Sequence, residues 1–392
     1  MNPDLNTRDL FSVDLAAVVH PCVGRTAPAA PPTNPEHIGF ELGWDHAHHG
    51  ISPPAPYAQE PSPLRSGYLA GMSTFGARTL PPTAAVRQWL QLRLHAWRRG
   101  RSVELLLVTP NYLRQLATTH CPITREALGL PSASASDDDG FIARVRHDAA
   151  YAAGNLAMMS PPARVAKAAH GFASSQDIAR RLEAQAARGN TAAPQHDGLN
   201  AAQWCRMAVL CSYVEPLPHA RASELPLLVL PPNRLRLFNP VQALQAFISQ
   251  QLLSPGWSGR VNAIEALLRG PTARRAFRSF FQALLPRVLA AGRPIDPQRA
   301  RWAIEDAWGH AAVMQRWARF SSMLSAPRCE SLIKRAAAEQ LVPNGQRIEP
   351  MTDQQATDGW RLATQGLVPH GVSGEHRHRR WTGPASVAQT LH

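Results

Sequence analysis

The chain has little cysteine, and the few cysteines that it has are scattered. Its 392 residues contain five: Cys22, Cys121, Cys205, Cys211 and Cys329. No two of them are separated by two residues, and an odd number cannot pair completely. This pattern argues against a disulfide framework and against a cysteine-rich zinc module.

Long hydrophobic segments are missing as well. The longest apolar runs, such as 105–108 and 225–230, are far shorter than the roughly 20 residues that a membrane-spanning helix needs. The first residues, MNPDLNTRDLF, contain acidic side chains and no basic lead into an apolar core, unlike a secretory signal. The sequence therefore predicts a soluble cytoplasmic protein without a membrane partner.

Lysine is almost absent, so arginine carries the positive charge. The formal net charge is +13, and Lys167 and Lys334 are the two lysines. Thirteen arginines and Lys334 lie between residues 260 and 335, against five acidic residues. Guanidinium groups match phosphate oxygens, so one interpretation is a nucleic-acid surface, whereas the other is compositional bias. The candidate contacts in this region are Arg274, Arg275 and Arg278.

Proline content and hydrophobic periodicity divide the chain into regions. Residues 1–81 are rich in proline and histidine and predict a partly irregular N-terminal region. Residues 82–190 predict helices with a small ββα unit, and residues 199–366 predict a helical C-terminal domain. Residues 367–392 predict a disordered tail. The expected fold class is therefore mainly α with one ββα unit and an irregular, proline-rich N-terminal region.

Several helix boundaries can be predicted from capping residues. Thr83 and Thr109 precede helical patterns, and Ser160 stands before a proline that suits the first helical position. The periodicity further predicts one long helix over 296–320 and another over 353–365.

Tryptophan and arginine alternate within 296–320. These aromatic side chains could stack on bases, or they could form the core beneath an arginine-rich face. The helical spacing of Trp302 and Trp317 favours the core, with the arginines left as the surface that contacts a partner.

A stretch of 25 residues, 143–167, carries the most specific pattern, ARVRHDAAYAAGNLAMMSPPARVAK. Together with CPIT at 121–124, it resembles the HNH (ββα-metal) endonucleases of phages and mobile elements. The likeness rests on Tyr151, on Gly154, Asn155 and Leu156, and on Lys167 twelve residues after Asn155. The resemblance implies two strands and a helix, an asparagine that fixes the turn, a histidine base and a divalent metal ion.

The chain departs from that family at three reactive positions. Ala143 stands where an acidic residue is expected, Arg144 where other branches place the base, and Arg164 where the helix would supply a ligand. Alanine cannot bind a cation, and a guanidinium is too basic to accept a proton near neutrality. Arg144, Arg164 and Lys167 are instead expected to contact nucleic acid.

Cleavage would require a rearranged site. His147 beside Asn155 is the candidate base, and these two are the candidate catalytic residues. Mg²⁺ or Mn²⁺ is expected as a cofactor only in that case. The alternative is that His147 belongs to the tip of the hairpin and that the acidic run 137–139 is a solvated loop.

A histidine cluster near the N-terminus offers a weak metal site. Asp45, His46 and His48 lie within the sequence WDHAHHG, and imidazole and carboxylate groups bind transition metals. No second cluster of matching character accompanies them, so an incidental surface feature is the favoured interpretation.

Three functions remain open from the sequence. The first is a nucleic-acid-associated protein with a degenerate HNH-like hairpin that binds DNA without efficient cleavage. The second is an active metal-dependent endonuclease with His147 as a shifted base. The third is a helical scaffold that binds a protein partner.

Overall fold

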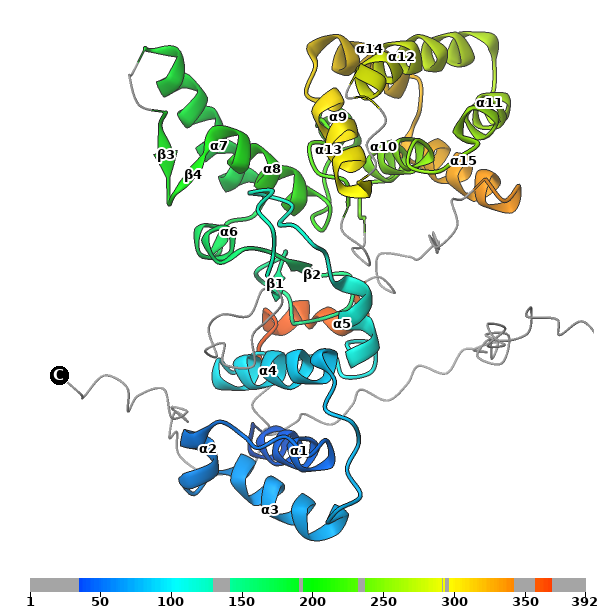
Figure 1. Cartoon of the computed structure of the whole chain (residues 1–392). Helices are drawn as coiled ribbons and strands as arrows, with labels where there is room; N and C mark the ends of the chain where they lie inside the picture. Colours follow the sequence, from blue (N-terminus) through cyan, green and yellow to red (C-terminus); the bar gives the residue numbers. More distant parts are fainter. Residues whose placement is uncertain are drawn as a thin grey trace, which may run out of the picture.

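The computed structural model describes most of the chain, namely residues 35–129, 142–189, 193–231, 237–290, 292, 296–341 and 357–368. Over these ranges the protein is mainly helical, with two small antiparallel hairpins (Figure 1). The expected mainly α fold class is confirmed at this level. The acidic run 137–139 and residues 369–392 lie outside the described ranges.

The N-terminal part is more helical than its proline content predicts. It contains α1 (Pro35–His48), α2 (Ala55–Gln59) and α3 (Pro63–Phe75). Proline is tolerated here because Pro63 occupies the first turn of α3, where Ser62 Oγ caps the helix by accepting from Arg65 N at 3.1 Å. Within the region 1–81, which the sequence predicts to be partly irregular, the described residues thus form three helices.

Glycines allow α1 and α3 to pack backbone against backbone. A Cβ atom added to Gly43 would lie 1.9 Å from the Leu64 carbonyl oxygen, and one added to Gly67 would lie 1.9 Å from the Phe40 carbonyl oxygen. Real Cβ contacts are never this short, so both positions require glycine. The close approach makes α1 and α3 one compact pair.

The central part begins with two helices whose caps follow the prediction. Thr83 Oγ1 accepts from Val86 N at the start of α4 (Ala84–Arg98), and Thr109 Oγ1 accepts from Tyr112 N at the start of α5 (Pro110–Leu116). Because each hydroxyl satisfies a free N–H of the first turn, both helices begin where the sequence predicts.

A hairpin and a helix follow. β1 (Ile142–Arg144) pairs antiparallel with β2 (Leu156–Met158), with Ala143 opposite Ala157, and α6 (Pro161–Lys167) comes next. Ser160 precedes α6 as predicted but does not cap it with its side chain. Its hydroxyl instead lies 3.1 Å from Thr124 Oγ1, which ties the CPIT turn to the start of α6.

A second hairpin begins between the two predicted regions 82–190 and 199–366. β3 (Gln195–His196) and β4 (Leu199–Asn200) pair between α7 (Phe172–Ala187) and α8 (Ala201–Ser212), which pack side by side. Asn200 accepts from Gln203 N, and Gln203 reaches back to Asn200 N, so a reciprocal cap begins α8.

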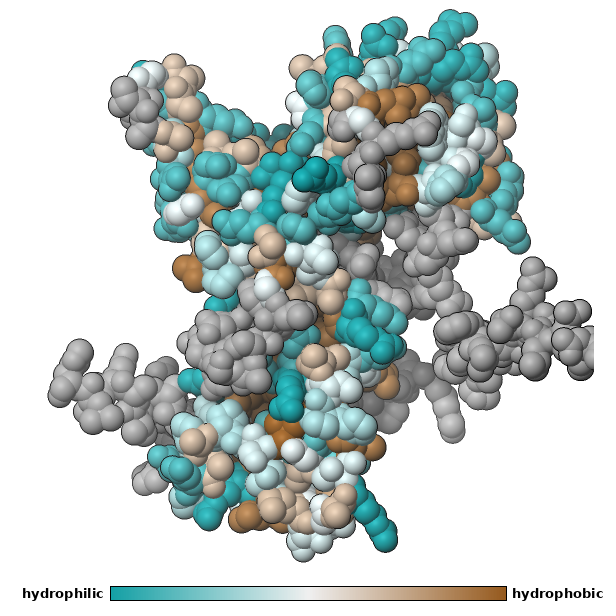
Figure 2. All heavy atoms as spheres, in the orientation of Figure 1, coloured by the Kyte–Doolittle hydropathy of each residue, from teal (hydrophilic) through white to brown (hydrophobic). Residues whose placement is uncertain are grey.

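The C-terminal helices surround an aromatic core. They are α9 (His219–Ser223), α10 (Pro240–Gln251), α11 (Trp257–Leu267), α12 (Pro271–Ala290), α13 (Pro297–Trp308), α14 (Ala311–Ser321) and α15 (Ala326–Ala338). Trp308 and Trp317 are fully buried, with ring centroids 5.2 Å apart. On the face in Figure 2, hydrophilic residues cover most of this helical group, and apolar side chains show between its helices.

Three predictions for this part need revision. The long helix over 296–320 was wrong, because His310 adopts an extended backbone and separates α13 from α14. The core assignment holds for Trp317, whereas Trp302 is only half-buried, with the Arg125 guanidinium 5.5 Å from its ring centroid. The helix predicted over 353–365 is replaced, in its described part, by two short 3₁₀ turns, η2 (Asp358–Trp360) and η3 (Leu362–Thr364).

The segment 357–368 packs against the central part of the chain. Trp360 is fully buried and donates from Nε1 to the Ala153 carbonyl at 2.9 Å, and its own carbonyl accepts from Ala150 N at 2.7 Å. Figure 1 shows this segment between α4 and the β1–β2 hairpin. Two regions that are more than 200 residues apart in sequence thus form one unit.

No helix in the described ranges is both long enough and apolar enough to cross a membrane.

Candidate nucleic-acid interface

The turn between β1 and β2 is organised by the side chain of Asn155. This residue is fully buried, and its Oδ1 accepts from Arg146 N at 2.7 Å. Its Nδ2 donates to the carbonyls of Arg146 at 3.1 Å and Ala150 at 3.0 Å. Both amide N–H groups and the amide oxygen are therefore used to hold the turn, which leaves Asn155 a positioning role.

Arg144 supports the same turn from the other side. Its Nη1 donates to the carbonyls of His147 at 2.7 Å and Ala149 at 2.8 Å, and its guanidinium lies 5.1 Å from the Tyr151 ring centroid. Burial lowers the pKa of Arg144, although a guanidinium keeps its charge near neutrality. The residue thus contributes positive charge at the turn while its Nη1 is occupied by backbone oxygens.

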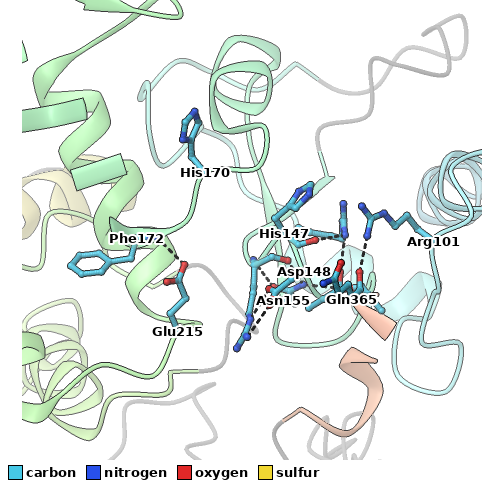
Figure 3. Close-up of polar contacts among 12 residues, drawn as sticks. Arg101, His147, Asp148, Asn155, His170, Phe172, Glu215 and Gln365 are labelled. Atoms are coloured by element: carbon cyan, nitrogen blue, oxygen red, sulfur yellow. Dashed lines mark hydrogen bonds and ion pairs between the residues drawn. The ribbon is translucent and has the colours of Figure 1, made fainter. Parts of the chain in front are cut away.

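His147 faces a group of positive charges. Its pKa is lowered first by burial and then by Arg144, Arg101 and Lys167. Figure 3 shows His147 and Arg101 on the same side of the turn, where Arg101 Nη1 donates to the Gln365 carbonyl at 2.7 Å. His147 is therefore a neutral imidazole near pH 7, with cations around it.

The carboxylate beside His147 is already paired. Asp148 Oδ1 accepts from Arg146 Nε at 2.8 Å, and Oδ2 accepts from Arg146 Nη2 at 3.0 Å. This bidentate pair lowers the pKa of Asp148 and neutralises its charge locally. Asp148 acts to raise the pKa of His147, but burial and the three cations lower it by more.

Lys167 is more deeply buried than a residue that contacts phosphate should be. It is 2% exposed, and its Nζ donates to the His170 carbonyl at 3.3 Å. Burial also lowers the pKa of Lys167. Its expected direct contact with phosphate is therefore not available at this position, and its effect on the turn is electrostatic. Arg164, on the preceding turn of α6, is half-buried.

The residues at the hairpin do not fit a divalent metal ion. Ala143 has no donor atom, Arg144 and Arg164 are cations, and Asp148 is held by Arg146. A site for Mg²⁺ needs carboxylate or carbonyl oxygens that are free to point at the ion. No catalytic step through a metal ion can be derived from this set.

The arginines predicted on α12 are mostly used within the protein. Arg274 donates to the carbonyls of Leu268 at 2.9 Å and Ala266 at 3.1 Å, and Arg278 pairs with Glu265. Arg275 forms no hydrogen bond or ion pair within the described ranges, and all three arginines are exposed. They lie on α12, away from the β1–β2 hairpin (Figure 1).

The N-terminal histidine cluster does not converge on one point. Asp45 Oδ2 accepts from the buried guanidinium of Arg93, and His46 Nδ1 lies 3.2 Å from the Ile51 carbonyl. His48 stacks on Phe75, with ring centroids 4.3 Å apart. Burial lowers the pKa of His46 to about 4. The three weak candidate ligands are therefore each engaged elsewhere, and their arrangement does not favour a metal site.

A different set of ligand types does come together. The side chains of His170, His196 and Asp197 have donor atoms within 4.8 Å of one another. Sequence spacing gave no signal for this group, because His170 is separated from the other two by an entire helix.

Comparison with known proteins identified no relative. No protein-family model matches the chain, and neither the curated proteins nor the solved structures gave a significant match.

Proposed function

We propose that this protein binds nucleic acid at the positively charged side of the β1–β2 turn and does not cleave it efficiently. The observation that carries the proposal is the gathering of three cations, Arg101, Arg144 and Lys167, around the neutral imidazole of His147. Figure 3 shows Arg101 and His147 at this turn. A polyanion with closely spaced phosphates is the ligand class that such a group attracts. The HNH-like order of strand, turn, strand and helix supports the same proposal.

The lack of efficient cleavage follows from the side chains at the turn. Hydrolysis of a phosphodiester needs a base and stabilisation of the charge that develops on the phosphate. His147 can serve as a base because it is neutral, but Ala143, Arg144 and Arg164 offer no ligand for a metal ion. In this proposal the hairpin has the positive charge that binds phosphate but lacks the ligands that would hold a catalytic metal ion.

The lowered pKa of His147 supports one alternative, an endonuclease that uses this imidazole as a shifted base. Incubating supercoiled plasmid with the full chain and with Mg²⁺ or Mn²⁺ separates the two proposals. Retention of the plasmid on a filter without nicking supports binding alone. Nicking that His147→Ala abolishes supports the endonuclease, and neither retention nor nicking contradicts both.

A further inference from the structure

A group of metal-binding side chains lies apart from the β1–β2 turn. In the parts of the chain that the structure describes, one set of three potential ligands has all its donor atoms within 4.8 Å. His170 comes from the connection between α6 and α7, and His196 and Asp197 come from the tip of the β3–β4 hairpin. We propose that these three residues bind one divalent transition metal ion, for which Zn²⁺ is the best match.

The chemistry of the set favours such an ion. Two imidazole nitrogens and one carboxylate oxygen are common ligands of zinc, whereas Mg²⁺ and Ca²⁺ prefer oxygen ligands alone. Each of the three side chains can supply one donor atom, and the protein would leave a fourth position for water or an anion.

The hairpin turn places two of the ligands together. Asp197 and Gly198 have φ values of +47° and +76°, and His196 pairs with Leu199 across the turn. Asp-Gly is a preferred sequence for a two-residue turn in which both residues are left-handed. This turn brings His196 Nε2 to 3.6 Å from Asp197 Oδ2.

A buried tryptophan holds the two imidazoles in place. Trp204 of α8 is fully buried, and its Nε1 donates to the His196 carbonyl at 3.0 Å. Its ring contacts His170 edge to face, with centroids 5.4 Å apart, and also contacts His196 at 5.7 Å. The Lys167 ammonium donates to the His170 carbonyl. Both histidines are therefore anchored through core residues.

The distances between the three donor atoms are close to those between the ligand atoms of a bound zinc ion. Zinc–nitrogen bonds of about 2.0 Å place tetrahedral donors about 3.3 Å apart, so the ligand atoms need to move by roughly 1 Å. The side chains of His196 and Asp197 are 45% and 52% exposed and can make this adjustment.

A surface groove borders one of the three residues, His170. It has a volume of about 560 Å³ and is lined by His170, Ser174, Asp177, Ile178, Arg180 and Arg181. Solvent can therefore reach His170 from this side.

Metal binding would join the tip of the β3–β4 hairpin to the connection that follows α6. This consequence does not depend on nucleic-acid binding, because none of the three ligands belongs to the β1–β2 turn.

The test is a titration of the full, metal-free chain with Zn²⁺ by calorimetry and with Co²⁺ by absorption spectroscopy. We expect one zinc ion to bind, and cobalt to give the visible bands of a low-coordinate site. His170→Ala, His196→Ala and Asp197→Asn should each weaken that site by at least about tenfold and reduce the cobalt bands. His310→Ala, which removes an exposed imidazole outside the group, should leave both titrations unchanged.

Asp197→Asn decides the outcome if a histidine variant fails to fold, because it preserves the shape of an exposed side chain in a turn. Zinc and cobalt titrations of Asp197→Asn that coincide with those of the wild type would overturn the proposal. A wild-type chain that binds neither zinc nor cobalt would also overturn it. The same holds if His310→Ala weakens metal binding as much as the substitutions of the three ligands do.

Discussion

The side chain of Asn155 and the backbone of Arg146 form two hydrogen bonds, one in each direction. Oδ1 accepts from Arg146 N at 2.7 Å, and Nδ2 donates to the Arg146 carbonyl at 3.1 Å. A third bond, to the Ala150 carbonyl, closes the turn at its other end. The amide therefore satisfies backbone groups of the turn that lie outside the β1–β2 pairing, and it holds the segment that carries His147.

Removing this amide should destabilise the fold. Asn155→Ala removes three hydrogen bonds and leaves Arg146 N and the Ala150 carbonyl without a partner, so the free energy of unfolding should fall by about 2 to 4 kcal/mol. Urea denaturation measures the change. Asn111→Ala, at an exposed position on α5, is the matched control and should stay within about 0.5 kcal/mol of the wild type. Equal midpoints for the two variants would show that the turn is held by other contacts.

Acid should weaken the N-terminal helices through His46. Its pKa is lowered by burial to about 4, below the ordinary value of 6.5, so the unfolded chain binds the proton more readily. This contribution is complete above pH 6.5 and is lost as the pH falls toward 4. Between pH 7 and 4.5 the loss should be about 2 to 3 kcal/mol.

The measurement is denaturant unfolding at both pH values for the wild type and for His46→Gln, which cannot titrate. The variant should show the smaller loss between pH 7 and 4.5. His310→Gln controls for an exposed histidine and should behave as the wild type does. An equal loss in His46→Gln and the wild type would exclude His46 as the source.

Close packing of α1 against α3 should make glycine necessary at Gly43. A methyl group there meets the Leu64 carbonyl, so Gly43→Ala should cost about 1 to 3 kcal/mol or separate the two helices. Gly259→Ala is the control, because a Cβ on this helical residue meets nothing within 4 Å. It should stabilise α11 by about 0.5 to 1 kcal/mol. Thermal unfolding of both variants measures these two opposite changes in stability. Destabilisation by both substitutions would contradict the packing argument.

Trp360 should control the stability of the β1–β2 turn from the distant end of the sequence. Trp360→Ala removes a fully buried ring and should cost about 3 to 5 kcal/mol. The Ala150 amide, which donates to the Trp360 carbonyl, should then exchange its hydrogen faster. Hydrogen exchange of residues 146–155 tests this, with α12 amides as the internal reference. Unchanged exchange at Ala150 would show that the segment 357–368 is dispensable for the turn.

Local signals in the sequence predicted the local structure well. Thr83 and Thr109 begin helices because their hydroxyl groups satisfy the N–H groups of the first turn. The break at His310 was missed because the apolar periodicity continues from α13 into α14 although the backbone does not. Capping residues thus indicate where a helix begins more reliably than periodicity indicates where it ends.

The residues of the β1–β2 turn and of the His170 group are brought together by contacts that the spacing of residues in the sequence cannot predict. The resemblance to the HNH endonucleases implied the turn-fixing role of Asn155, but the burial of Lys167 depends on how α6 packs. Likewise, His170 meets His196 only because β3 returns to the start of α7. The sequence predicts properties of single helices and strands, but it does not predict the distances between them.

The central claim is that the positive side of the β1–β2 turn binds the phosphates of nucleic acid. Filter binding of a DNA duplex over a series of salt concentrations tests it most directly in the wild type, Arg101→Gln and the control Arg78→Gln, which removes an exposed arginine elsewhere. We expect the affinity to fall with salt, and Arg101→Gln to weaken binding and to lower the slope of log K against log salt by about one. Affinity that is independent of salt, or equal slopes for all three proteins, would contradict it.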